Sequence, residues 1–404
     1  MKIRSVTYFN DPGSPLSEDF FKSAEVFARE ARSHFQSTDY ELQTIRFASP
    51  PFSLFLDDLP SDQVILYAQE LEHELMGLGY EYVSLGPALP SKPNSYLLIP
   101  DLIRNTGNTF FSGMLTDPEQ GLSLSAVRTC GKIINKLADI DPNGFSNLYF
   151  AALGNVPPGG PFFPAAYHGE SGPNFSIALE AADLAVDAFS KSSSFEEARK
   201  ELARQMEEYG DELSRLSLEL AKTTGAQFGG IDYSLAPFPE ENRSLGYALE
   251  KTGVKAVGTH GSLAAAAFLA DSIERADFIR TGFSGLMLPI LEDSILADRG
   301  ADGNLGVKDL LLYSAVCGTG LDTVPLPGSA TPGQLSALLF DLGALSIRLD
   351  KPLTARLMPI PGKEAGEPTT FDFPFFKNSR VMELQAEELG NFFKGNGYLD
   401  IRKR

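Results

Sequence analysis

The chain has 404 residues, of which 43% are hydrophobic, and its formal net charge is −19 at pH 7. Nucleic acids and anionic membranes would repel so acidic a protein, so we expect neither as a partner. The sequence lacks the roughly 18 consecutive uncharged apolar residues of a membrane span and the apolar core of a signal peptide. Its two cysteines, Cys130 and Cys317, provide no disulfide framework, which predicts a cytoplasmic protein with reduced thiols.

Short β-rich runs alternate with longer helical patterns from end to end. Expected strand 3–9 precedes helix 18–35, strand 41–47 precedes helix 62–76, strand 82–85 precedes helix 124–137, and strand 147–153 precedes helix 195–222. Strand 226–233 then precedes helix 262–275, strand 283–290 precedes helices 294–299 and 307–316, strand 322–326 precedes helix 332–349, and strand 355–360 precedes helix 382–393. This alternation predicts an α/β fold with parallel strands covered by helices. Because no Pro/Gly/Ser-rich linker divides the chain, we expect residues 1–404 to form one domain with helical additions on its surface.

Two of the expected helices carry further signals. Ser123 is placed to cap the helix at 124–137. The helix at 195–222 is long and highly charged, which predicts a solvated surface, with a homodimer contact as the alternative.

Two loops next to the expected strands combine unusual composition with polar side chains. Residues 155–168 are rich in proline and glycine, which fixes an irregular backbone, and they end in Tyr167 and His168. Residues 229–239 place Asp232 and Ser234 after two glycines at the end of a strand.

Two further loops have similar features. Residues 258–262 read Gly-Thr-His-Gly-Ser and lead into a helix, so His260 lies near free backbone amides that could bind an anion. Residues 314–328 place Cys317 before a glycine-rich turn, with Asp322 following. A thiol on a tight loop that leads into a strand is expected to face a cavity.

In parallel α/β folds, the loops at the carboxyl ends of strands gather over one cavity. We therefore expect the four loops to form a single site. The expected catalytic residues are Cys317, His168, His260 and Asp232. The expected substrate-binding residues are Tyr167, Ser234, Thr259, Gly318, Thr319 and Asp322. A divalent metal ion is an optional cofactor, with Asp232, Glu292 and Asp293 as its ligands.

Each candidate also has a structural interpretation. Free cysteine packs well in cores, so Cys317 could be a buried apolar residue. His168 could hydrogen-bond its own loop, and Asp232 could cap a turn. For Glu292 and Asp293, a structural role at the start of helix 294–299 is favoured, because acidic side chains stabilise helix N-termini. Neither a nucleophile-elbow pattern nor a His-Glu-x-x-His motif is present.

Six ordered segments carry a family resemblance. They are Phe-Phe-Pro-Ala-Ala-Tyr-His at 162–168, Phe-Ser-Ile-Ala-Leu-Glu at 175–180, Gly-Ile-Asp-Tyr-Ser-Leu-Ala-Pro at 230–237, Gly-Thr-His-Gly at 258–261, Ser-Gly-Leu-Met-Leu-Pro-Ile-Leu-Glu-Asp at 284–293 and Ala-Val-Cys-Gly-Thr-Gly-Leu-Asp at 315–322. With them the chain, from near its amino terminus to about residue 361, resembles domain-of-unknown-function family 711. The resemblance implies the fold of pyruvate formate-lyase and other glycyl-radical enzymes, which is a ten-stranded barrel of two five-stranded parallel half-barrels wrapped by helices. In the radical enzymes an inward finger loop carries a cysteine, and the segment around Cys317 is the natural counterpart.

The carboxyl-terminal region departs from the radical enzymes. Their radical is stored on a glycine in an Arg-Val-x-Gly-aromatic block, whereas this chain has only Gly395-Asn-Gly-Tyr and a basic end. A glycyl radical is therefore not expected, and fold resemblance alone does not transfer the activity.

Three functional hypotheses follow. The leading one is a non-radical enzyme acting on a small polar metabolite, with Cys317 as nucleophile or acid/base and with His168 and His260 handling protons or anionic groups. The second is a protein that binds a metabolite or metal without turnover. The third is a radical enzyme that receives its radical from a separate protein.

Overall fold

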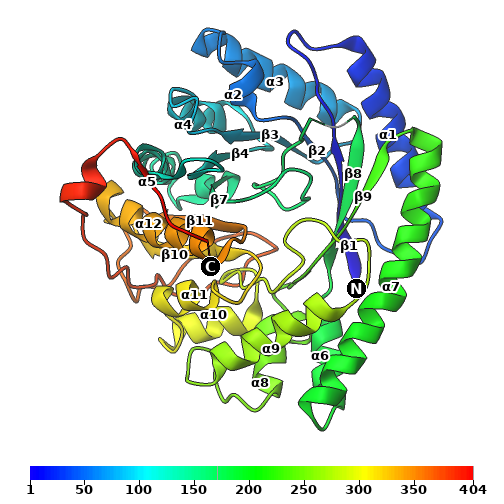
Figure 1. Ribbon diagram of the computed structural model, residues 1–404, viewed down its shortest axis with the longest axis vertical. Helices are drawn as coiled ribbons and strands as arrows, with labels where there is room; N and C mark the ends of the chain where they lie inside the picture. The colour runs from blue at the N-terminus through cyan, green and yellow to red at the C-terminus, as the bar shows by residue number, and fades with distance from the viewer. Residues whose placement is uncertain (171, 404) are drawn as a thin grey trace.

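A computed structural model describes residues 1–170 and 172–403. A nine-stranded sheet with strand order β10-β11-β7-β4-β3-β2-β1-β8-β9 forms its centre (Figure 1). The strands are β1 Lys2–Phe9, β2 Ile45–Ala48, β3 Tyr82–Ala88, β4 Thr109–Met114, β7 Phe150–Gly154, β8 Asn174–Glu180, β9 Gln227–Ala236, β10 Gly320–Pro327 and β11 Leu353–Ile360. A second, three-stranded sheet joins β5 Thr116–Asp117, β6 Gly121–Ser123 and β12 Tyr398–Leu399.

The large sheet is mixed but mostly parallel. Strands β1, β2, β3, β4 and β7 are parallel neighbours, and so are β8 with β9 and β10 with β11. The two antiparallel joints are β1 with β8 and β7 with β11. This confirms the α/β class and adds a reversal of strand direction on each side of the central parallel group.

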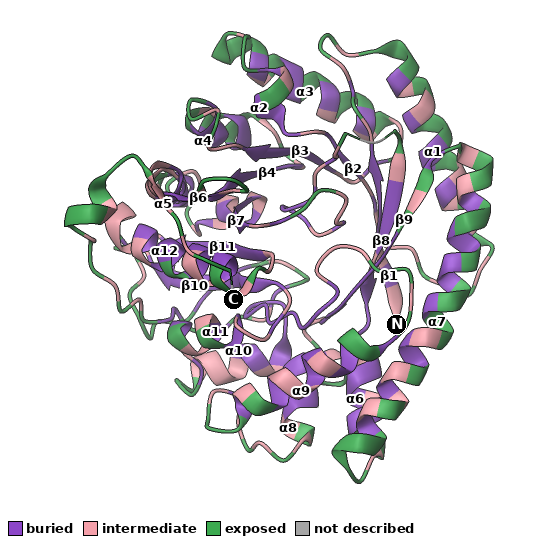
Figure 2. Cartoon of the chain, viewed as in Figure 1, coloured by how far each residue is buried: buried purple, intermediate pink, exposed green. Residues whose placement is uncertain are grey.

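The helices surround the outside of the curved sheet, while irregular loops fill its inner side (Figure 1). They are α1 Glu18–Gln36, α2 Phe52–Phe55, α3 Ser61–Gly77, α4 Ser95–Asn105, α5 Leu124–Ala138, α6 Ala182–Lys191, α7 Phe195–Thr224, α8 Leu245–Lys251, α9 Ser262–Arg275, α10 Ser294–Ala301, α11 Val307–Tyr313 and α12 Pro332–Leu349. Their inward faces are buried and their outward faces exposed (Figure 2). The main core therefore lies between helices and sheet, where residues such as Phe27, Phe35 and Leu71 are buried. No helix in the described part of the chain is long and apolar enough to cross a bilayer.

Local sequence signals account for several helix starts. The Ser123 side chain accepts a hydrogen bond from the backbone N–H of Ala126 at 3.2 Å, which confirms the expected cap of α5. The Thr331 hydroxyl and the Gln334 side chain form a reciprocal capping box at the start of α12, with Pro332 in the first turn. The helices expected at 262–275 and 332–349 match α9 and α12.

Two expected elements differ in the structure. Residues 283–290 do not form a strand of the sheet. The loop at 280–290 makes two isolated bridges instead, from Arg280 to Ile231 of β9 and from Pro289 to Asp322 of β10. Because β9 and β10 are not paired directly among the described residues, a continuous ten-stranded barrel is not confirmed.

The helix expected at 382–393 is wrong. This segment is irregular apart from the short 3-10 turn Asn391–Lys394. Its polar groups bond to other parts of the fold, since the N–H of Met382 donates to the carbonyl of Pro325 and the Gln334 side chain donates to the carbonyl of Ala386. Tertiary contacts have replaced the intrahelical hydrogen bonds that the local pattern favours. The α-helices and strands without a counterpart in the sequence-based expectations are α2, α4, α6, α8, β4, β5, β6, β8 and β12.

Candidate functional site

A cavity of about 340 Å³ lies against the large sheet. Its lining comes from β1, β2, β3, β4, β8, β9 and β11, so the curvature brings strands from both ends of the sheet around one space. The segments around Phe162 and around Phe375 complete the lining. Cavities of this size commonly hold small molecules.

The cavity gathers positive charge in an otherwise acidic protein. It is lined by Lys2 and by four arginines, Arg4, Arg46, Arg243 and Arg356. The chain as a whole carries a formal charge of −19. The cavity therefore differs in charge from the rest of the molecule. Whether each of these cations can bind a ligand depends on the ion pairs that it already makes.

Arg356 and Arg4 belong to a buried ion-pair network. Arg356 on β11 donates from Nε to Asp322 Oδ1 at 2.6 Å and from Nη2 to Glu292 Oε1 at 2.8 Å. Arg4 on β1 donates from Nη2 to Glu292 Oε2 at 2.6 Å. Burial opposes ionisation of Glu292, but Arg4 and Arg356 outweigh it and hold the pKa of this carboxyl below its usual value. The network thus joins β1, β10 and β11 to the loop that precedes α10.

Two further cations also have carboxylate partners. Arg243 forms an ion pair with Glu180 of β8, contacts Glu240 at 3.5 Å, and lies over the Phe238 ring at 4.2 Å. Lys2 pairs with Glu41 at 2.7 Å.

Arg46 is the exception. Its guanidinium lies over the rings of Tyr82 at 5.4 Å and Phe163 at 5.2 Å, and its Nε donates to Thr44 Oγ1 at 2.9 Å. Within residues 1–170 and 172–403, no carboxylate pairs with Arg46 and no acceptor bonds its terminal nitrogens. Burial and the neighbouring charge of Arg4 lower the pKa of Arg46 to about 10, so it remains cationic at neutral pH.

Arg4 adds a second free donor near this position. Its Nη1 is buried and has no hydrogen-bond partner in the described structure, although its Nη2 bonds Glu292. Buried polar groups are normally satisfied, and buried charges are normally paired. Because Arg46 has no carboxylate partner among the described residues and lines the cavity, an anion is favoured at Arg46.

Asp232 and Ser234 on β9 form a polar pair that lines the same cavity. The Ser234 hydroxyl donates to Asp232, and the backbone N–H groups of Phe283 and Ser284 donate to the same carboxylate, each at 3.0 Å. Burial raises the pKa of Asp232 despite these hydrogen bonds. Gly282 permits the close approach: its φ is +61°, and a Cβ there would lie 2.2 Å from Asp232 Oδ2.

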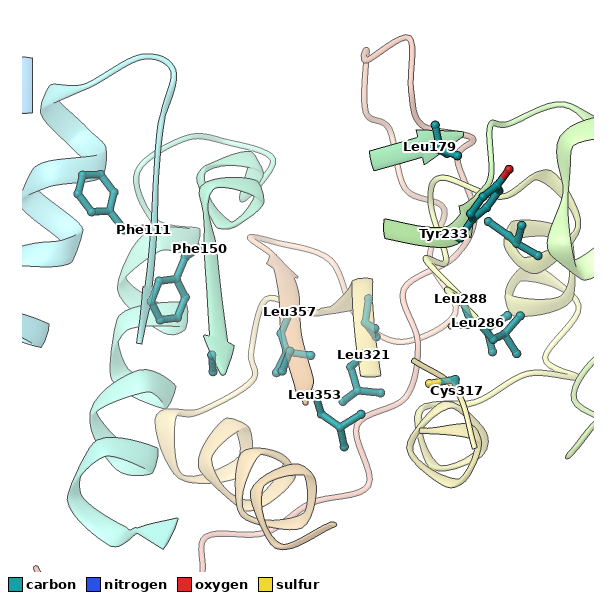
Figure 3. Packing of buried hydrophobic residues seen from close by; sticks show 14 of the residues in the cluster. Phe111, Phe150, Leu179, Tyr233, Leu286, Leu288, Cys317, Leu321, Leu353 and Leu357 are labelled. Carbon is teal, nitrogen blue, oxygen red and sulfur yellow. The ribbon is translucent and has the colours of Figure 1, made fainter. Parts of the chain in front are cut away.

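Cys317 lies in the hydrophobic core. It is 1% exposed, belongs to the main apolar cluster, and is surrounded by leucines that include Leu286 and Leu321 (Figure 3). It is not part of the cavity lining.

The two candidate histidines are separate from the cavity lining as well. His168 is buried in the loop that follows β7. Its backbone N–H donates to the carbonyl of Ser49 at 2.8 Å, and its ring Nδ1 lies 3.4 Å from the side-chain nitrogen Nδ2 of Asn174. His260 is exposed just before α9. The expectation that a thiol, two imidazoles and nearby acids line one chamber is therefore not met, because Cys317 packs in the core and His260 faces outward.

The remaining substrate-binding candidates lie outside the lining as well, except Ser234. The Tyr167 hydroxyl donates to the carbonyl of Val156 at 2.8 Å, and the exposed Thr259 hydroxyl donates to the carbonyl of Ala256 at 2.7 Å. The N–H of Gly318 donates to the carbonyl of Leu286 at 2.8 Å, and Thr319 is fully buried. Asp322 is buried behind the cavity as a partner of Arg356.

The three candidate metal ligands have other partners. Asp293 accepts from the Ser244 hydroxyl at 2.5 Å and from the N–H groups of Leu245 at 2.6 Å and Leu296 at 3.0 Å, so it caps both α8 and α10. Glu292 is held by two arginines, and Asp232 by Ser234 and backbone amides. In the described part of the chain, no group of three His, Cys, Asp or Glu side chains could hold a metal ion.

The arginines of the cavity were not among the sequence-based candidates. Arg4, Arg46 and Arg356 each lie within an expected, mostly apolar strand, at 3–9, 41–47 and 355–360. A charged residue inside a strand that is covered on its outer face by helices must point inward or be paired. The sequence contains that signal, but the ion pairs that distinguish Arg46 from Arg4 and Arg356 are visible only in the structure.

Comparison with known proteins identifies relatives of unknown activity. Residues 1–378 match the family described as Uncharacterised ACR (DUF711). The chain is 27% identical over 340 residues to a UPF0210 protein of Oenococcus oeni, covering 81% of this chain and 76% of the relative. It is 28% identical over 347 residues to a UPF0210 protein of Acetivibrio thermocellus, with the same coverage of 81% and 76%. A UPF0210 protein of Pyrobaculum arsenaticum is 33% identical over 258 residues, which cover 61% of this chain and 56% of the relative.

Proposed function

This chain belongs to the DUF711 family of uncharacterised proteins, and we propose that it is a non-radical enzyme that binds a small anionic metabolite in the cavity. The observation that carries this proposal is Arg46, a partly buried guanidinium in the cavity wall that lacks a carboxylate partner among the described residues. A buried unpaired charge costs considerable free energy, so its natural partner is an anionic ligand.

Asp232 is the proposed proton-transfer group. Its carboxyl group lines the cavity, and burial raises its pKa above the usual value, a direction that favours a carboxyl group as a proton carrier. Ser234, hydrogen-bonded to Asp232, would orient this carboxylate or contact the ligand.

A metabolite-binding protein without turnover is the second candidate. Two observations favour it: the described residues of the cavity lining include no cysteine, and Glu292 is engaged by two arginines. Such a cavity could recognise a ligand without converting it.

We also propose that the sheet is an incomplete form of the ten-stranded barrel of glycyl-radical enzymes. Support comes from the group of five parallel strands, β1, β2, β3, β4 and β7, and from the antiparallel joints at its two edges. The loop at 280–290 would take the place of a tenth strand, since it bridges to β9 and to β10.

The first test is anion binding by the intact protein, measured as a shift of the thermal unfolding midpoint. At least one of inorganic phosphate, succinate and phenylacetate should raise the midpoint, because a ligand that binds only the folded state stabilises it. Arg46→Gln should abolish the shift. Arg215→Gln, at an exposed arginine of α7, is the matched control and should retain it. No shift with any anion, or an undiminished shift in Arg46→Gln, would refute the proposal.

The second test separates the two candidates. Proton transfer by Asp232 predicts that a bound carboxylic acid exchanges carbon-bound hydrogen with D₂O, followed by NMR, and that Asp232→Asn stops the exchange while binding persists. Asp277→Asn, at an exposed aspartate, should exchange like the wild type. Binding without any exchange would favour the protein without turnover.

A further inference from the structure

Among the described residues, the ion pairs of the cavity leave one cation without a carboxylate partner, and the carboxyl group of Asp232, which also lines the cavity, is bonded to Ser234 and two backbone N–H groups and to none of these cations. Lys2 pairs with Glu41, Arg243 with Glu180, and Arg4 and Arg356 share Glu292 and Asp322. Within the described residues, Arg46 alone among the lining cations lacks such a partner. A ligand that pairs with Arg46 without disturbing the other ion pairs needs one negative charge.

The free donors have the geometry for a carboxylate. The two terminal nitrogens of Arg46 have no acceptor among the described residues, and a planar guanidinium binds a carboxylate through two parallel hydrogen bonds. Arg4 also lines the cavity; its Nη2 bonds Glu292, and its Nη1 is buried and has no partner among the described residues. Arg46 itself is held between Tyr82 and Phe163, so its orientation is fixed before a ligand arrives.

The rest of the wall is suited to a flat apolar body. Aromatic rings line the cavity in two sets. One set surrounds Arg46, where Phe110 contacts Tyr82 and Phe163 edge-on with ring centroids 5.4 Å apart in both pairs. The other set brings Phe375 within 6.0 Å of Phe238 and 5.3 Å of Phe373. Aromatic rings pack best against other rings, through stacked and edge-to-face contacts.

We infer that the ligand of this cavity is an aromatic monocarboxylate, with its carboxylate on Arg46 and its ring against the aromatic wall. This inference rests on the proposed function, because it names the class of anion that the same cavity takes. A phosphate dianion would leave an excess negative charge next to Glu292, and a dicarboxylate would need a second unpaired cation, which the described lining does not provide.

Phenylacetate and its neutral analogue phenylacetamide test this inference, because they have nearly the same shape and differ in charge. Isothermal titration calorimetry should find that phenylacetate binds the wild type at least about tenfold more tightly than phenylacetamide, as expected for hydrogen bonds to a charged group. Arg46→Gln should remove this preference, whereas the exposed control Arg215→Gln should keep it. Arg46→Lys retains the charge without the two parallel donors and should bind phenylacetate with intermediate affinity, which provides a second variant if the first does not fold.

Each outcome has a distinct meaning. Arg46-dependent binding of succinate or inorganic phosphate, with phenylacetate bound more weakly, would overturn the inference and leave the anionic cavity intact. Hexanoate bound as tightly as phenylacetate would overturn the aromatic part. Failure of all these anions to bind would overturn the inference together with the proposed function.

Discussion

Arg356 and Arg46 are two arginines in the wall of one cavity with opposite surroundings. Each lies over a phenylalanine ring, Arg356 over Phe162 at 5.7 Å and Arg46 over Phe163 at 5.2 Å. The Arg356 side chain is 6% exposed and is bound by two carboxylates, whereas among the described residues Arg46 contacts only a threonine hydroxyl and two rings. The first arrangement is complete without a ligand, and the second is not. We therefore assign Arg356 to stability and Arg46 to binding, and substitutions at the two sites should separate these roles.

Arg356→Met should have the largest effect on stability. It would leave Asp322 and Glu292 buried with one arginine fewer, and removing one partner of a buried ion pair costs about 3–5 kcal/mol. Urea unfolding followed by circular dichroism measures this loss. The triple variant in which Asp322→Asn and Glu292→Gln accompany the change should recover part of it, because no uncompensated carboxylate remains. A loss below about 1 kcal/mol for Arg356→Met would contradict a structural role.

Arg46→Met should leave stability within about 1 kcal/mol of the wild type, although it removes a partly buried guanidinium of the same cavity. The reason is that no carboxylate is left unpaired, while the desolvation cost of an unpaired charge disappears; a methionine also retains contact with Tyr82 and Phe163. The same urea experiment measures it. A loss as large as that of Arg356→Met would mean that Arg46 is also structural, and the comparison between the two sites would fail.

The sequence predicted elements best where local signals and tertiary packing agree. Helix α12 has a proline in its first turn and a capping box at Thr331, and its expected bounds were confirmed. The segment at 382–393 has a helical pattern, but its backbone and side-chain contacts lie with β10 and α12, so packing prevailed over propensity. Strand β8 was missed because both of its pairing partners, the antiparallel β1 and the parallel β9, lie more than 50 residues away in the chain.

The candidate site was predicted only in part for the same reason. Asp232 and Glu292 line the cavity as expected, since each follows an apolar segment that leads to the inner side of the sheet. Cys317 follows an apolar segment too, but its loop lies against Leu286 and Leu321 in the core. The sequence pattern is the same for a loop that faces a cavity and for a loop that faces a core. What distinguishes Arg46, the lack of a carboxylate among its described neighbours, depends on contacts between segments distant in sequence.

The smallest predicted effect is the contribution of Glu292, the carboxylate paired with Arg4 and Arg356, to the pH dependence of stability. In the folded state Arg4 and Arg356 hold the pKa of Glu292 below its usual value, so the unfolded chain binds a proton at this residue more readily. The resulting stability is fully present above the unfolded pKa, roughly 4.3, and is lost as the pH falls through the lower folded value. Urea unfolding between pH 6 and the acid limit of folding, at roughly pH 3 to 4, should therefore show a shallower decline in Glu292→Gln than in the wild type. Glu387→Gln, at an exposed glutamate, should keep the wild-type slope. Equal slopes in all three proteins would mean that the arginine network does not favour the ionised form of Glu292, and the contrast with the unpaired Arg46 would lose its electrostatic basis.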